Sequence, residues 1–191
     1  SPHQRPAEWS AGLAKAGGIL LVGREVEMEI PLLRIAGAKM SLPVSLTYRS
    51  GLADAPHRAG VGSAMVLNLD QRIENPTPGG PVSLRTGSKL IDGFIPLDQP
   101  SGLYASPPGV FSLLFFDAGA GHYWFENLEG TKRYFDARTG WLKAIEDAFG
   151  NRIDIHRSGF EPHQVRSVVN DQGLITRFYW QLDGRLAAVM A

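Results

Sequence analysis

The stretch that decides the fold is FSLLFFDAGAGHYWFENLEGTKRYF, residues 111–135. It contains three short apolar runs, which are joined by Asp-Ala-Gly-Ala-Gly and Asn-Leu-Glu-Gly. Asn, Asp and Gly tolerate the positive φ angles that tight hairpins need. The stretch therefore predicts three consecutive strands joined by two hairpin turns.

The same punctuation continues toward the C-terminus, where Asp and Gly residues repeatedly separate two β-compatible runs. These predicted repeat-turn residues are Asp136, Gly140, Asp147, Gly150, Asn151, Asp171, Gly173, Asp183 and Gly184. Gly140 and Gly184 are 44 positions apart, which corresponds to two units of about 22 residues. A period of this size indicates repeated hairpins, each of which must lie beside the next to bury its apolar face.

Toward the N-terminus the alternation of residue types predicts further strands. In residues 25–30, Val26, Met28 and Ile30 alternate with three glutamates, which is typical of a half-buried strand. Residues 41–50 predict a second strand, with Pro43 at its start or at a sheet edge. We also expect strands within 64–69, 81–86, 89–95 and 110–116, and an irregular N-terminal arm with one helical turn near residues 7–14.

Composition limits the classes of partner. The 19 basic residues balance the 19 acidic ones, so no overall field attracts nucleic acid or an anionic membrane. The longest apolar run, residues 17–23, is far shorter than the roughly 20 residues that cross a bilayer. The absence of cysteine excludes thiolate catalysis and Cys-based zinc sites, but leaves the compartment open.

The residues that could carry chemistry do not form a recognisable motif. Glu25, Glu27 and Glu29 could bind a hard cation, but we interpret them as a solvated face that discourages edge pairing. The histidines lack metal-ligand spacing, and residues 60–63 fit neither a phosphate loop nor a nucleophile elbow. We therefore expect no catalytic residue, no metal and no cofactor, and we do not expect an enzyme.

Clustered aromatic residues raise the question of a binding surface. Adjacent residues of a strand point to opposite faces, so some rings of each cluster must face away from the local core. Residues that could contact a partner or cargo are Tyr123, Trp124, Trp141, Tyr179 and Trp180. The alternative is that both faces are covered and these rings serve core packing.

Several of these motifs resemble one known family. Residues 135–151 resemble one tyrosine-aspartate (YD) repeat of Rhs proteins, Tc toxin BC components and teneurins. The matching positions are Phe135-Asp136, Gly140, Leu142, Ile145, Asp147 and Gly150-Asn151. Phe stands in place of the usual Tyr, and Trp141 stands where Arg is usual. Phe178-Tyr179 followed by Asp183-Gly184-Arg185-Leu186 looks like the start of another. Met28 to Pro31 and Leu42 to Ser50 are similar to the segment that precedes the repeats in bacterial Rhs proteins, although Gly62-Ser63 stands where that segment usually has Gly-Trp.

The resemblance implies a fold and a role. In the family, many hairpins form a strip that spirals into a hollow shell, and in bacterial members the shell encloses a C-terminal toxin. The chain would then be all-β, with an N-terminal arm (1–17), a β-rich domain that precedes the repeats (18–116) and YD-type hairpin repeats (117–191). It would be a wall segment of the shell, with an open strand edge that needs a neighbour.

The same resemblance implies the partners and the location. These are the remainder of the shell and an enclosed toxin domain, with secretion-apparatus proteins or chaperones as further partners, in a bacterial effector made in the cytoplasm and exported. Two other functions stay open. One is a surface adhesin or carbohydrate-binding module that uses exposed Trp and Tyr, and the other is a hydrolase whose site is assembled from separate loops, with a His beside a carboxylate.

Overall fold

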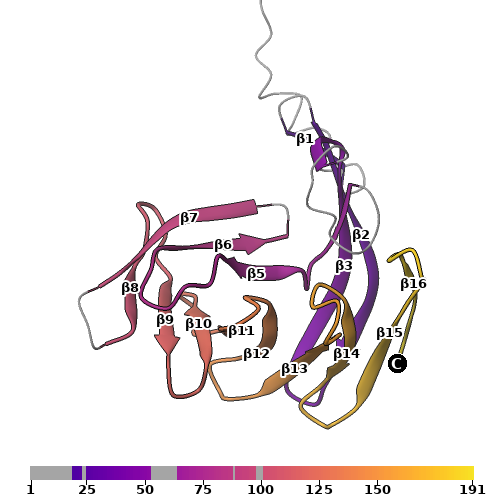
Figure 1. The fold of residues 1–191 in the computed structure, drawn as a ribbon. Helices are drawn as coiled ribbons and strands as arrows, with labels where there is room; N and C mark the ends of the chain where they lie inside the picture. Colours follow the sequence, from indigo (N-terminus) through magenta and orange to yellow (C-terminus); the bar gives the residue numbers. More distant parts are fainter. Residues whose placement is uncertain (1–18, 23–24, 53–63, 88, 98–100) are drawn as a thin grey trace, which may run out of the picture.

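The computed structural model describes residues 19–22, 25–52, 64–87, 89–97 and 101–191. Apart from the single 3-10 turn η1 (Ser50–Leu52), every regular element in these ranges is a β-strand. The strands form two antiparallel sheets, neither of which closes into a barrel (Figure 1). The prediction of an all-β fold built from antiparallel hairpins is confirmed. The predicted N-terminal arm lies outside the described residues.

The N-terminal sheet has the order β1-β2-β3-β4. Its strands are β1 (Ile19–Val22), β2 (Glu25–Ala36), β3 (Ser41–Arg49) and β4 (Met65–Leu67). The strand predicted at residues 25–30 is thus present and extends to residue 36. A register shift between Pro31 and Leu33 interrupts the pairing of β2 with β3. Because proline has no N–H to donate to the ladder, this irregularity accommodates Pro31 within the strand.

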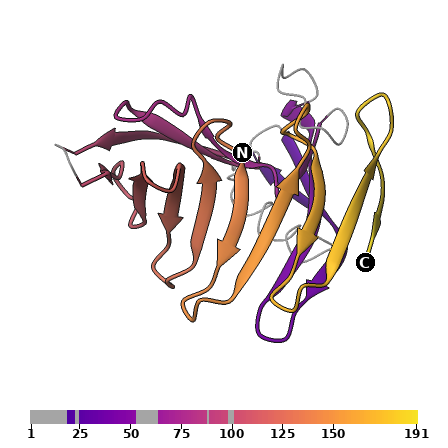
Figure 2. The same cartoon turned by 60° about the horizontal axis from the view of Figure 1, so that its bottom comes forward.

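The second sheet contains 12 strands in strict chain order, and each is antiparallel to the strand before it. They are β5 (Gln71–Glu74), β6 (Val82–Thr86), β7 (Lys89–Pro96), β8 (Leu103–Ala105), β9 (Leu113–Asp117), β10 (His122–Glu126), β11 (Lys132–Asp136), β12 (Leu142–Glu146), β13 (Arg152–Arg157), β14 (Val165–Val169), β15 (Ile175–Trp180) and β16 (Leu186–Met190). Figure 2 shows this sheet as a strongly curved strip.

The stretch 111–135 forms β9, β10 and β11, as its turns predict. The expected strand at 110–116 begins only at Leu113. The predicted start of the repeats, residue 117, is the last residue of β9. The strands on the two sides of this predicted boundary therefore share one sheet. The short strands β5 and β8 were not predicted, because their sequences, Gln-Arg-Ile-Glu and Leu-Tyr-Ala, show no sustained alternation of apolar and polar residues.

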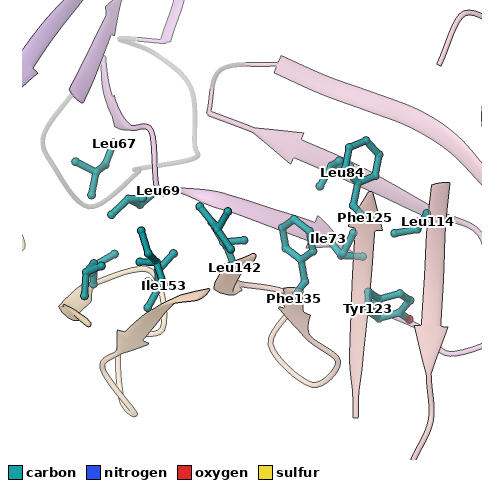
Figure 3. Close-up of a cluster of buried hydrophobic side chains, with 14 of the residues drawn as sticks. Leu67, Leu69, Ile73, Leu84, Leu114, Tyr123, Phe125, Phe135, Leu142 and Ile153 are labelled. Carbon is teal, nitrogen blue, oxygen red and sulfur yellow. The ribbon is translucent and has the colours of Figure 1, made fainter. Parts of the chain in front are cut away.

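The curvature of the strip brings its first strand back over its own inner face. The backbone N–H of Ile73 in β5 donates to the carbonyl of Gly140, at 2.8 Å, and Arg72 forms an isolated bridge with Trp141. Ile73, Phe135 and Leu142 are all fully buried members of the same apolar cluster (Figure 3). A single apolar core joins β5 to the middle strands and includes Ile35 and Val44 of the N-terminal sheet.

The tip of the β2–β3 hairpin is attached to the turn between β14 and β15. The Asp171 carboxylate accepts the backbone N–H groups of Ala38 and Lys39, at 3.1 and 2.8 Å. The Asn170 side-chain amide donates to the carbonyl of Ala36, at 2.6 Å. We call these contacts the hairpin latch. A Cβ on Gly37 would lie 1.9 Å from an Asp171 carboxylate oxygen, so the latch requires glycine at this position.

Candidate functional site

One turn geometry recurs along the strip. In the β10–β11 turn, the N–H of Gly130 donates to the carbonyl of Asn127, and the Asn127 side-chain oxygen accepts the N–H groups of Glu129 and Thr131. Gly130 has a φ of 77°. The first residue of the turn thus satisfies two backbone donors, while glycine supplies the positive φ. We call this five-residue arrangement the Asx-x-x-Gly turn.

Two further connections repeat it with a different first residue. Asp147 opens the β12–β13 turn and accepts the N–H groups of Phe149 and Asn151, each at 2.9 Å. The hydrogen bond from the Asn151 side chain is the largest of several contacts that lower the pKa of Asp147. Asn170 opens the β14–β15 turn and accepts the N–H of Leu174 in the same way. These turns join strands with very short loops, which keeps the strip continuous.

The other predicted turn residues occupy different positions within their turns. Asp136 accepts the N–H groups of Arg138 and Thr139 in a turn that is one residue longer and ends at Gly140. Burial raises the pKa of Asp136, but these hydrogen bonds outweigh it and the net shift is downward.

Asp171 and Asp183 do not open their turns. Asp171 is the second residue of the turn that ends at Gly173 and forms the hairpin latch instead, while Asn170 takes the first position. Asp183 is the third residue of the β15–β16 turn, where Gln181 is first and Gly184 fourth, and it accepts the N–H of Arg185. The spacing of Asp and Gly in the sequence located these turns. It did not identify the residue that opens each turn.

The first two aromatic candidates lie on opposite faces of β10. Tyr123 is fully buried and its ring centroid lies 4.8 Å from that of Phe116. Trp124 is half-buried, stacks on Phe115 at 5.1 Å and has the Lys132 ammonium 5.3 Å from its ring centroid. Tyr123 therefore contributes to the core, whereas Trp124 belongs to a ladder of side chains on the outer face of the sheet.

The remaining candidates differ in exposure. The half-buried Trp141 has the guanidinium groups of Arg72 and Arg157 within 5.0 and 4.8 Å of its ring centroid. The indole N–H of Trp180 donates to the carbonyl of Val165, at 2.7 Å. Tyr179, next to it in the chain, is 46% exposed. Of the five candidates, Tyr179 thus offers the most accessible ring.

Tyr179 lies beside the free edge of the sheet. Among the described residues, β16 pairs only with β15, so its other side has no strand partner. The sequence of β16, Leu-Ala-Ala-Val-Met, contains neither a charge nor a proline. Met190 is 60% exposed and Ala188, opposite Tyr179, is also exposed. An uncharged edge of this kind is a template for another strand.

Sequence reasoning missed the most strongly buried charges, which join the connection between the two sheets to the repeats. Arg157 in β13 donates to the carbonyls of Leu69, Leu142 and His163. Its guanidinium lies 3.9 Å from an Asp70 carboxylate oxygen. We call Arg157 and Asp70 the buried pair. No local motif signals it, because Leu69 and Arg157 are 88 positions apart in the chain.

Burial dominates the electrostatics of this pair. Loss of hydration raises the pKa of Asp70 to about 6, although the nearby Arg157 charge opposes the shift. Burial likewise lowers the pKa of Arg157 to about 10, against the opposing effect of Asp70. One Asp70 oxygen accepts the backbone N–H of Leu67, whereas the other has no hydrogen-bond partner. The carboxylate is therefore only partly compensated.

The histidines of the described chain show no metal site. No group of three or more His, Cys, Asp or Glu side chains gathers closely enough there to hold an ion. His163 lies 3.3 Å from Glu161, in the connection between β13 and β14. His122 packs edge-on against Tyr134, with ring centroids 5.1 Å apart. The only His–carboxylate contact found in these ranges thus joins two residues of one surface loop.

Comparison with known proteins adds no family assignment. A scan against models of protein families gives no match, and a search of curated proteins also gives none. Within the described ranges, the structure contains no helix of the length and apolar character needed to cross a bilayer.

Proposed function

We propose that this chain is a structural wall segment of an Rhs-type shell that encloses a toxin domain or helps to deliver it. The observation that carries the proposal is the unbroken chain-order sheet that ends on the uncharged edge of β16. Each strand of this sheet pairs with the strand before it, so a further hairpin at β16 would continue the same pattern.

The recurring turns support a repetitive wall. Asn127, Asp147 and Asn170 open connections of equal length and equal hydrogen bonding. Further hairpins with the same turn geometry can be added to such a sheet, because each hairpin buries its apolar side against its neighbours. The YD-type resemblance of residues 135–151 agrees with this arrangement.

Under this proposal the chemistry of the parent protein resides outside the segment. The partners are the remainder of the shell and the enclosed toxin, with secretion-apparatus proteins or chaperones acting on the exported effector. The role of the segment is mechanical. It separates the toxin from its surroundings, and its curvature is maintained by the contact of β5 with the turn at Gly140.

The coding sequence that follows the Ala191 codon provides a direct test. We expect further hairpins with Asx-x-x-Gly turns at intervals of about 22 residues, followed by a domain of different composition. Sequencing of the genomic locus measures this. A stop codon directly after Ala191 would contradict the proposal of a wall segment within a longer chain.

A second test uses the free edge. We expect the purified chain to associate through β16, and Ala188→Lys to reduce that association at least tenfold, because a charge beside Tyr179 opposes strand addition. Arg177→Lys, on the same outer face in β15, is the control and should leave association unchanged. Analytical ultracentrifugation measures the dissociation constants. Equal association of the wild-type and Ala188→Lys chains would count against the edge.

A further inference from the structure

A row of exposed apolar side chains lies along one rim of the 12-stranded sheet. Antiparallel strands place successive connections at alternate ends, so the connections at residues 106–112, 127–131, 147–151 and 170–174 share one rim. We call it the docking rim, because the β2–β3 tip attaches there (Figure 2). Each connection presents one large apolar residue. These are Phe111 (76% exposed), Leu128 (80%), Phe149 (91%) and Leu174 (62%).

The opposite rim of the 12-stranded sheet has a different distribution of exposed apolar side chains. Its connections at residues 118–121 and 137–141 present no exposed large apolar side chain. They separate Leu97, in the connection after β7, from Phe160 and Leu182 in the last two connections, at 158–164 and 181–185. An uninterrupted apolar row is therefore a property of the docking rim. Phe160 and Leu182 provide equally exposed residues for comparison.

The connections of the docking rim form a close row. Neighbouring strands are about 4.8 Å apart, so tips at every second connection recur about every 10 Å. A Cβ on Gly130 would lie 3.0 Å from the Cβ of Ala148, which shows that the second and third connections touch. Leu128 and Phe149 thus belong to one surface.

The rim already contacts one other chain tip, that of the β2–β3 hairpin, which lies beside the β14–β15 turn (Figure 2). The hairpin latch joins Asp171 and Asn170 to residues 36–39, and the Lys39 charge acts on Asp147 in the adjacent connection. The intramolecular contact uses Asn170 and Asp171 and leaves Leu174, Phe149 and Leu128 exposed. A partner on these residues would continue an interface that exists within the chain.

We propose that the docking rim is an interface between two copies of this chain, which meet rim to rim about a two-fold axis. An axis through the middle of the row sets Leu128 of one copy opposite Phe149 of the other, and Phe111 opposite Leu174. It also brings the exposed Lys39 of one copy toward the exposed Glu129 of the other. The row is thus complementary to itself in period, in apolar character and in charge.

This interface goes beyond the proposed wall function and uses a different surface. Wall growth adds strands at β16, along the direction of the hydrogen bonds. Rim contact joins two strips at the ends of their strands. Either contact can exist without the other, so the two proposals can fail separately.

The absence of cysteine from the sequence permits a clean cross-linking test. Phe149→Cys and Leu128→Cys chains are mixed and oxidised by oxygen with copper phenanthroline, so that two thiols form one disulfide and pass two electrons to oxygen. We expect the mixed disulfide dimer to form at least fivefold faster than the dimer of Phe160→Cys, the control on the opposite rim. Equal rates for the two rims would overturn the proposal.

Sedimentation velocity on the full chain provides the second measurement. In the Ala188→Lys background, which removes the β16 contact, we expect Leu128→Asp with Phe149→Asp to raise the dimer dissociation constant at least tenfold, whereas Phe160→Asp with Leu182→Asp leaves it unchanged. Circular dichroism confirms that both double variants are folded. An Ala188→Lys chain that stays monomeric at all concentrations, or a docking-rim double variant that dimerises like Ala188→Lys alone, would overturn the rim interface.

The Ala188→Lys variant separates the two proposals. If the rim interface is correct, Phe149→Cys and Leu128→Cys still cross-link in the Ala188→Lys background. If Ala188→Lys abolishes both association and rim cross-linking, the association belongs to the β16 edge and the rim proposal fails.

Discussion

At the scale of single residues, the buried pair is the most unusual feature. Arg157 uses its donors on carbonyl groups of three separate segments, so it positions the intersheet connection and the β13–β14 connection relative to β12. A carboxylate oxygen of Asp70 lies 3.9 Å from the Arg157 guanidinium and forms no direct hydrogen bond with it. An incompletely compensated buried carboxylate costs stability when it is ionised.

This cost predicts an uncommon pH dependence. Burial raises the pKa of Asp70 from 3.8 to about 6. The folded chain therefore takes up a proton as the pH falls through about 6, whereas the unfolded chain takes it up only near its ordinary pKa. The contribution of Asp70 to the free energy of unfolding thus rises as the pH falls from 7 to 5, by roughly 1 kcal/mol.

Asp70→Asn tests this expectation, because the amide keeps the shape and does not titrate. Urea unfolding at pH 5.0, 6.0 and 7.5 measures the free energy of unfolding of both chains. The difference between wild type and Asp70→Asn should shift in favour of wild type as the pH falls. A pH-independent difference would show that Asp70 keeps its ordinary pKa in the fold.

Prediction from sequence succeeds at this scale only where the signal is local. Tyr123 and Trp124 point to opposite faces, as neighbours in a strand must. The buried pair and the hairpin latch join segments 87 or more positions apart, and no spacing in the sequence records such contacts. Asp171 illustrates the limit, since its place beside Gly173 indicates a turn residue but not its bonds to Ala38 and Lys39.

At the scale of elements, the strip depends on its turns. Gly140 and Gly150 both have positive φ angles, 78° and 83°, and a side chain in this region costs about 1 kcal/mol. They differ in their surroundings. A Cβ on Gly140 would lie 2.2 Å from the carbonyl oxygen of Ile73, whereas none of the described atoms approaches one on Gly150 within 4 Å.

This matched pair yields a prediction about the return of β5. Gly150→Ala should cost about 1 kcal/mol of unfolding free energy, the price of the φ angle alone. Gly140→Ala should cost at least about 2 kcal/mol more, because its methyl group displaces β5 from the β11–β12 turn. Urea denaturation measures both values. Equal losses would mean that β5 does not lie against Gly140 in solution.

The elements also show why strand prediction was uneven. β10 and β13 alternate buried and partly exposed residues over five or six positions, and their patterns are visible in the sequence. In β12 two adjacent residues, Ala144 and Ile145, are buried, so the period of two is lost locally. The irregularity agrees with the register shift between Tyr134 and Phe135 of β11, which pairs with β12.

At the scale of the whole molecule, the hairpin latch connects the N-terminal sheet to the distant end of the strip. Lys39 and Asp171 are 132 positions apart. Removal of the latch should loosen the β2–β3 tip without unfolding the strip, because Ile35 and Val44 still contribute to the common core. The two sheets would then remain associated through their apolar surfaces.

Hydrogen exchange on Asp171→Ala tests this arrangement. We expect the amides of Ala38 and Lys39 to exchange faster, roughly tenfold for each 1.4 kcal/mol of local stability lost, while those of β10 to β12 are unchanged. Asp183→Ala, in an exposed turn of the same strip, is the control. Unchanged protection of residues 38 and 39 would show that Asp171 does not hold the tip.

The strict order of the strands also bears on how the chain acquires its shape. Almost every pairing joins neighbours in sequence, so the ladder has low contact order and can assemble progressively as the polypeptide leaves the ribosome. The bonds of Asp171 to Ala38 and Lys39 can form only after the ribosome has passed residue 171, which lies 132 positions beyond Lys39. Until then the early hairpins lack their final attachment, and this is the interval in which a nascent chain most needs protection from misassembly.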